Sequence, residues 1–173
     1  MALDYTEGGT VKVRIIDYID EIIYVFDKVY PRGRDINASA VLEDLYNIDE
    51  DREKLSPDKD DMFHNIVTTT LYTNKWARPD TCTEVASLAT IFREPNNYEW
   101  SKLIHLMKYI RGTGDIPLVL STNRSGFLNW WIDASYAVHP NMWGHTGGCI
   151  SIGRQFTILK STKQKLNTRS STE

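Results

Sequence analysis

The spacing of apolar residues changes near Pro117 of this 173-residue chain, and this change constrains the fold more than any other feature. Between residues 57 and 111, apolar side chains recur every three or four positions, which is typical of amphipathic helices. From Pro117 onward they recur at every second position, which is typical of half-buried strands. The chain is therefore expected to have an α+β fold in which helices precede an antiparallel sheet.

The helical stretch is predicted to contain three helices. The first begins at Ser56-Pro57, with Ser as the N-cap and Pro at the first helical position. The second follows Pro79-Asp80 and ends at Pro95, and the third covers about 98–111. One flank of this third helix carries a basic residue at every third position, at Lys102, His105, Lys108 and Arg111. We therefore expect a basic edge on the helical region.

Four strands are predicted after the helices, at 118–121, 127–133, 148–152 and 156–161. The last two are expected to form a hairpin through Gly153-Arg154. Their close spacing without an intervening helix favours an antiparallel meander, with one face left uncovered.

The start of the chain has a simpler pattern. Residues 10–15 alternate as a strand does, and the apolar spacing over 17–29 predicts a helix. We expect this strand and helix to lack a sheet to join. A loop with one short helix at 41–46 is predicted after them.

Charge is unevenly distributed, although the formal net charge is only −3. Residues 43–61 contain nine acidic and three basic residues, a net of −6, whereas 154–169 contain five basic residues and no acid, a net of +5. A basic stretch can follow a phosphate backbone, and it can equally be an ordinary solvated surface. A further possibility is that the acidic segment folds over these basic residues and cancels them.

Membrane and secreted classes are not favoured. No apolar run approaches the roughly 20 residues of a membrane-spanning helix, and the N-terminus does not resemble a signal peptide. The two cysteines, Cys82 and Cys149, lie far apart, which suits a reducing compartment. We expect a cytoplasmic or nuclear protein.

Asp133 is the strongest single candidate for chemistry, because it ends an apolar strand that would hold it rigidly. It could be a metal ligand or an acid/base group, or it could simply accept backbone hydrogen bonds from the following loop. The Cys and His residues show no zinc-type spacing.

Several motifs resemble copia-type retrotransposon polyproteins in order and spacing over about residues 60–173. Ala77-Arg78-Pro79-Asp80 resembles the family's "TRPD", and the stretch from Trp100 to Thr113 resembles "W…LRYLKGT". The segment from Trp131 to Ala137 is similar to "YSDADWA", which opens the ribonuclease H domain. Three shorter segments are similar to the later "TSG", "KKQ" and "SSTEAE" motifs: Gly144–Gly148, Lys163–Lys165 and Ser170–Glu173.

The resemblance implies four regions. Residues 1–30 would be the end of the reverse transcriptase palm and the entry to the thumb, and 31–56 an acidic connector. Residues 57–116 would be a helical connection region, and 117–173 a truncated ribonuclease H-like domain with an incomplete antiparallel sheet.

The resemblance also implies site residues. Asp133 would bind catalytic Mg²⁺, while the RNA–DNA hybrid would contact Lys160, Lys163, Lys165, Arg169, Ser171 and Thr172. Ser135 stands where many relatives carry a second Asp. Ser170–Glu173 has the spacing of a capping box, which is typical of the start of a helix. Because no helix follows in the sequence, and the first strand and helix are expected to lack a sheet, we expect that both ends of the chain are cut. The next catalytic Glu would then follow Glu173, so we expect an incomplete metal site and no turnover.

Two functions remain open at this point. The chain is either a catalytically incomplete reverse transcriptase/ribonuclease H fragment with weak, non-specific nucleic-acid binding, or a non-enzymatic nucleic-acid-binding or interaction module. In the second case Lys102, Lys108 and Arg111 would join the basic strand region in contacting phosphates.

Overall fold

The computed structural model describes residues 1–6, 8–31, 36–49, 51–153 and 155–165. It has the expected α+β class, with helices and two three-stranded antiparallel sheets. In chain order the elements are β1 (Ala2–Thr6), β2 (Thr10–Arg14), α1 (Ile16–Asp27), α2 (Pro57–Trp76), the 3₁₀ turn η1 (Pro79–Thr81), α3 (Cys82–Thr90), α4 (Asn97–Thr113), β3 (Leu118–Ser121), β4 (Asn129–Ser135), β5 (His145–Ser151) and β6 (Phe156–Lys163).

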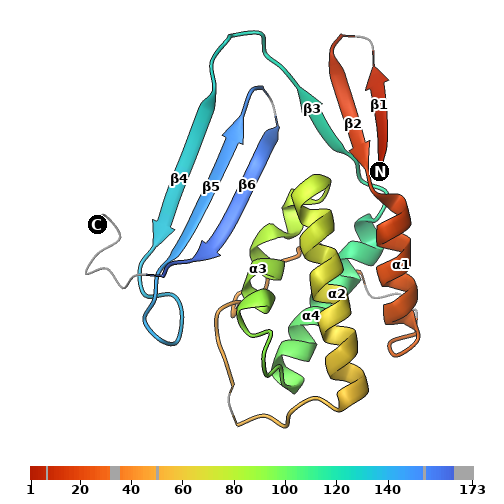
Figure 1. Cartoon of the computed structure of the whole chain (residues 1–173), viewed down its shortest axis with the longest axis vertical. Coiled ribbons are helices and arrows are strands. Elements are labelled where there is room, and N and C mark those ends of the chain that lie inside the picture. Colours follow the sequence, from red (N-terminus) through yellow and green to blue (C-terminus); the bar gives the residue numbers. More distant parts are fainter. Residues whose placement is uncertain (7, 32–35, 50, 154, 166–173) are drawn as a thin grey trace.

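The helices α1 to α4 pack together as one body that holds the main core (Figure 1). Fully buried apolar side chains come from all four of these helices. They include Ile22, Phe26, Phe63, Ile66, Leu88, Leu103, Leu106 and Ile110. The helices predicted from the apolar spacing are confirmed, with boundaries shifted by a few residues. Helix α4 begins with a capping box, formed by Asn96 and Glu99, that the sequence reading missed.

The first sheet has the order β1-β2-β3, and it corrects two expectations. Strand β2 does not lack a sheet, because it pairs with β1 on one side and with β3 on the other. Strand β3 does not join the later meander, since Val11 of β2 is in register with Leu120 of β3. The spacing identified these strands correctly, but it carries no information about which strand pairs with which.

The second sheet has the order β4-β5-β6, and the predicted antiparallel hairpin and its neighbouring strand are confirmed. Asp133 of β4 is in register with Gly147 of β5, which is in register with Ser161 of β6. Residues in register share a face of the sheet, so Asp133 and Ser161 lie on the same side. The opposite face is open, as expected, with Trp130, Ile132 and Ile158 exposed by 60%, 68% and 57%.

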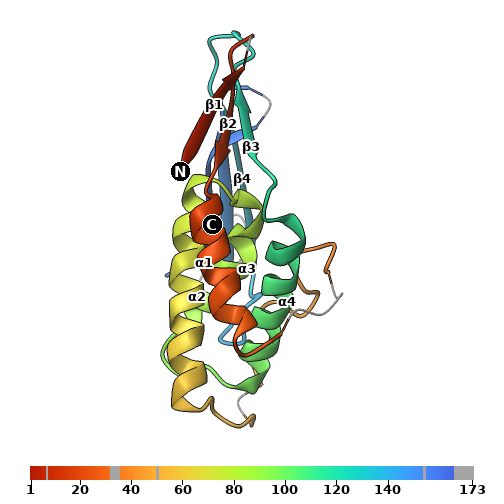
Figure 2. The same cartoon turned by 90° about the vertical axis from the view of Figure 1, so that its right-hand side faces the viewer.

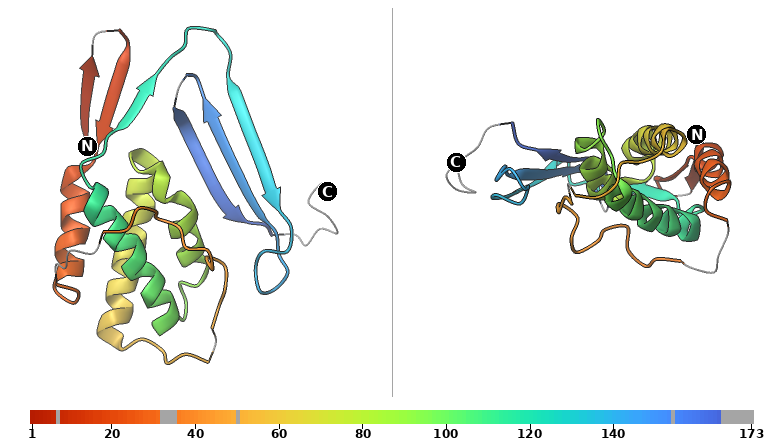
Figure 3. Two further views of the ribbon diagram at one scale, coloured as in Figure 1. Left: turned by 180° about the vertical axis from the view of Figure 1, so that it is seen from behind. Right: turned by 90° about the horizontal axis from the view of Figure 1, so that it is seen from below.

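The two sheets meet beside the helical body. A bridge joins Thr122 to Gly153, at the ends of β3 and of the β5–β6 hairpin. A Cβ atom on Gly153 would lie 1.7 Å from the carbonyl oxygen of Ser121, so this contact requires glycine. Strand β6 is the strand of the second sheet nearest to α3 (Figure 1; Figure 3 gives the view from behind).

The acidic connector crosses the helical body and does not form the predicted helix at 41–46, where the chain makes a turn. The Tyr98 hydroxyl of α4 donates to the carboxylate of Asp44, and the Asn96 amide donates to the carbonyl of Asp49 at 2.8 Å. Figure 2 shows the connector, in orange, along α4. Within the described residues, no helix is both long and apolar enough to cross a membrane.

Candidate functional site

Asp133 lies in the interior of β4 and is exposed. Its carboxylate accepts a hydrogen bond from the following backbone N–H, that of Ala134, at 2.8 Å. Ala134 belongs to the same strand, so this contact is not the hydrogen bond from a following loop that was the alternative to a chemical role. The contact uses one carboxylate oxygen and does not block access to the side chain.

A cavity of about 510 Å³ opens beside Asp133, between the second sheet and the helical body. The sheet contributes Trp131, Asp133, His145 and Ser161 to its lining, while Thr83 of α3 closes the other side. Tyr46 of the connector also lines the cavity. The connector therefore contributes to this site as well as covering α4.

The predicted phosphate-binding residues are only partly brought together. Lys160 and Lys165 are exposed, and Lys163 is half-buried with its ammonium 5.4 Å from the ring centre of Trp143. Lys160 and Lys163 are three residues apart on β6, so they point to opposite faces of the sheet. Arg169, Ser171 and Thr172 lie outside the described residues.

The basic edge expected on α4 is not an exposed surface. Lys102 is only 1% exposed, and its ammonium donates to the backbone carbonyls of Leu45 at 2.9 Å and Asn47 at 2.5 Å. The Arg111 guanidinium donates to the carboxylate of Asp27 at 2.5 Å. The acidic connector and α1 cover this edge, so Lys102 and Arg111 are not available to phosphates. The three-residue spacing of these basic residues could not show that they are covered, because it does not reveal which other segment packs on that flank of the helix.

Burial sets the electrostatics around Lys102. Burial raises the pKa of Glu84, on α3, to about 8, although the positive charge of Lys102 partly opposes this shift. Burial also lowers the pKa of Lys102, against the attraction of Glu99, Asp44 and Glu84. These groups lie beneath the connector and contribute no side chain to the cavity lining.

A chain of three side chains that the sequence reading missed runs from the sheet edge to the cavity. His139 Nε2 lies 3.1 Å from Nδ1 of His145, and His145 Nε2 lies 2.6 Å from the Ser161 hydroxyl. The Tyr46 ring packs on both imidazoles, with its centre 4.7 Å from the ring centre of His139 and 5.1 Å from that of His145. Burial lowers the pKa of His145 and, together with the charges of Lys163 and His145, lowers that of His139 to about 4. The alternation of β5 and β6 could have placed His145 and Ser161 on one face, but only if their register were known.

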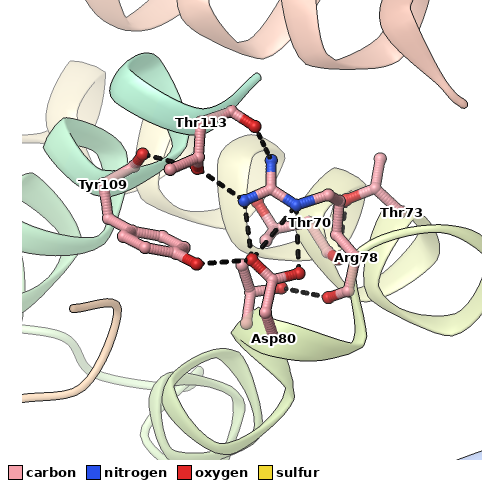
Figure 4. Close-up of polar contacts among 7 residues, drawn as sticks. Thr70, Thr73, Arg78, Asp80, Tyr109 and Thr113 are labelled. Atoms are coloured by element: carbon pink, nitrogen blue, oxygen red, sulfur yellow. Dashed lines mark hydrogen bonds and ion pairs between the residues drawn. The ribbon is translucent and has the colours of Figure 1, made fainter. Parts of the chain in front are cut away.

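The two family-like motifs of the helical region meet in one polar network (Figure 4). The buried Arg78 guanidinium forms an ion pair with Asp80 at 2.7 Å and donates to the carbonyl and hydroxyl of Thr113 at 3.1 and 2.7 Å. The Tyr109 hydroxyl donates to Asp80 at 2.8 Å. Burial opposes ionisation of Asp80, but its contacts with Arg78 prevail and hold its pKa below the usual value. This network ties the α2–α3 turn to the end of α4, which is a structural role.

Among the described residues, no second carboxylate lines the cavity beside Asp133. A two-metal centre needs several converging carboxylates. Asp133 is the one carboxylate among the described residues that line the cavity. Across the described part of the chain, no three His, Cys, Asp or Glu side chains gather where they could hold a metal ion.

Comparison with known proteins identifies no relative. No family model, curated protein or solved structure matches the chain.

Proposed function

We propose that this chain is part of a copia-type retrotransposon polyprotein, comprising the connection region and the first strands of a ribonuclease H-like domain. In this proposal it binds RNA–DNA hybrid weakly and does not cleave it. The sequence motifs resemble those of this family, and the second sheet supports the assignment of residues 117–173 to the start of the ribonuclease H-like domain.

One observation carries the proposal. The segment similar to the opening of the ribonuclease H domain forms β4, the first strand of an antiparallel β4-β5-β6 sheet, with Asp133 in its interior and lining a cavity. The resemblance implies this arrangement for the start of that domain. The motif-bearing helices precede the sheet in the implied order.

The described side chains support binding without cleavage. Asp133 alone cannot assemble two metal ions, whereas exposed Lys160 and Lys165 supply positive charge next to the same sheet. Attraction of this kind does not depend on sequence and weakens steeply as salt is raised.

The test is a titration of a fluorescent RNA–DNA hybrid at two salt concentrations. We expect a Kd on the order of 10⁻⁴–10⁻⁶ M near physiological salt, and tighter binding at low salt. The double variant Lys160→Glu/Lys165→Glu should abolish measurable binding. Lys75→Glu is the matched control, because Lys75 is an exposed lysine on α2 and not on the second sheet, and should leave binding nearly unchanged.

Two results would overturn the proposal. Absence of binding at low salt, or binding that the double variant and Lys75→Glu reduce equally, would remove the assigned surface. Cleavage of the hybrid in Mg²⁺ that Asp133→Asn abolishes would show a working metal site and contradict the binding-only role.

A further inference from the structure

We infer that Ser161 is a nucleophile that accepts an acyl group from an activated ester, with His145 as its general base and His139 as a positioning residue. This inference goes beyond the proposed nucleic-acid role and does not depend on it. It rests on the hydrogen-bonded side chains that reach the cavity between the second sheet and α3.

The hydrogen bonds of the two histidines determine which ring nitrogen can accept the Ser161 proton. In a neutral imidazole one ring nitrogen donates and the other accepts. When His139 accepts at Nε2, His145 donates from Nδ1, which leaves His145 Nε2 to accept the Ser161 hydroxyl proton. A serine activated by a histidine that a third group orients is the arrangement of a nucleophilic triad.

The surroundings of His145 hold this base in place. His145 begins β5 and His139 lies in the preceding turn, where its carbonyl accepts from the Met142 N–H at 2.8 Å. Both imidazoles are nearly fully buried, and the Tyr46 ring packs against them. Their burial keeps them neutral at pH 7, which is the state a general base requires.

The Ser161 hydroxyl is accessible from the cavity. Ser161 is half-buried and lines the cavity of about 510 Å³, so a small molecule can reach its hydroxyl. Trp131 and Leu159 line the same cavity, so it suits an apolar acyl group better than a charged one.

Acyl transfer begins with attack of the Ser161 hydroxyl oxygen on the ester. The Ser161 oxygen forms a bond to the ester carbonyl carbon while its proton passes to His145 Nε2. The bond between that carbon and the leaving-group oxygen breaks, and the leaving group takes the electron pair. His145 then releases its proton to the departing oxygen or to water, and Ser161 is left acylated.

The experiment treats the full chain with p-nitrophenyl acetate at pH 7 and follows two readouts. These are the release of p-nitrophenolate and, by peptide mapping with mass spectrometry, the position of each acetyl group. We expect acetylation of Ser161 to be faster than that of the exposed Lys75, which serves as an internal reference. In concentrated urea this preference should vanish, because the hydrogen-bonded chain no longer exists.

Variants assign the roles. His145→Gln should slow Ser161 acetylation by about 100-fold or more, since general base catalysis contributes that much. Ser135→Ala is the matched control, because Ser135 lines the same cavity but its hydroxyl is not part of the His139–His145–Ser161 hydrogen-bonded chain, and it should change nothing. His139→Gln keeps a hydrogen-bond acceptor for His145 Nδ1, so it should retain more of the Ser161 acetylation rate than His139→Leu does.

The inference is overturned if Ser161 in the native wild-type chain is acetylated no faster than in urea. It is also overturned if His145→Gln leaves the Ser161 rate unchanged. These readouts do not involve nucleic acid, so their failure would leave the proposed hybrid binding unaffected.

Discussion

The helical body and the second sheet both have apolar faces, spaced as in helices in one and as in strands in the other, but only the helical body buries all of its apolar faces. In the body, α1 to α4 bury their apolar faces against one another, and even Lys102 and Glu84 are enclosed. In the second sheet, one face lies toward α3 and the cavity, whereas the other leaves Trp130 and Ile132 exposed. A helix in a bundle finds partners on several sides, but a three-stranded sheet needs a separate layer for each face.

The difference in packing predicts that stability depends mainly on the helical body, and that ligand contacts are made mainly by the second sheet. The helical body holds polar groups in fully packed surroundings, so changing them should be costly. The second sheet has solvent and a cavity beside its side chains, so it can contact ligands and tolerate substitution. The following substitutions test this contrast, starting with the largest expected effect.

Matched isoleucines give the most direct test. Ile66→Ala on α2 should lower the free energy of unfolding by about 2–5 kcal/mol, because it leaves a hole in a filled core. Ile158→Ala on β6 should lower it by less than about 1 kcal/mol, since that side chain is largely exposed. Urea denaturation of both variants measures the difference, and equal losses would contradict the contrast.

The Arg78 network provides the second test. Arg78→Met should cost roughly 2–4 kcal/mol, because it leaves Asp80 unpaired and removes donors from both oxygens of Thr113. Arg52→Met is the control, since the Arg52–Asp49 pair is exposed, and it should change stability by less than about 0.5 kcal/mol. Comparable thermal midpoints for the two variants would mean that the network does not stabilise the body.

The buried Glu84 predicts a dependence on alkaline pH. Its folded pKa of about 8 lies above the ordinary value of 4.5, so the stability that it contributes below pH 4.5 is lost progressively as the pH rises from 4.5 through about 8. Between pH 7 and pH 9 we expect the free energy of unfolding to fall by about 1.4 kcal/mol from this group. Glu84→Gln should remove that fall in urea titrations, and a variant with the same pH dependence as the wild type would refute the assignment.

The histidine pair predicts a smaller dependence on acidic pH. The folded pKa of His139, about 4, lies below the ordinary 6.5, so the unfolded chain takes up a proton first as pH falls. Between pH 6.5 and 5.5 His139 should reduce the free energy of unfolding by about 1 kcal/mol. His139→Gln should flatten this part of the curve, as measured by near-ultraviolet circular dichroism during urea unfolding. An unchanged slope would mean that His139 is not buried in the neutral form.

Sequence reasoning worked best where a local pattern is sufficient. The helices and the strands of the second sheet follow from apolar spacing, and Gly153 was correctly placed in the connection between β5 and β6. Among the residues that line the cavity, the sequence pointed only to Asp133 as a candidate for chemistry. His139, His145 and Ser161 form no recognisable motif along the chain, so their hydrogen-bonded arrangement could not be predicted.

The sequence by itself determined the α+β class, the type of most elements and the position of Asp133 on a strand, because these depend on neighbours a few residues apart. The tertiary structure alone decided that β3 pairs with β2 and that the connector covers Lys102. It also decided that His145 of β5 meets Ser161 of β6. Each of these joins residues at least 16 positions apart, so it depends on register and packing between segments, which local spacing does not encode.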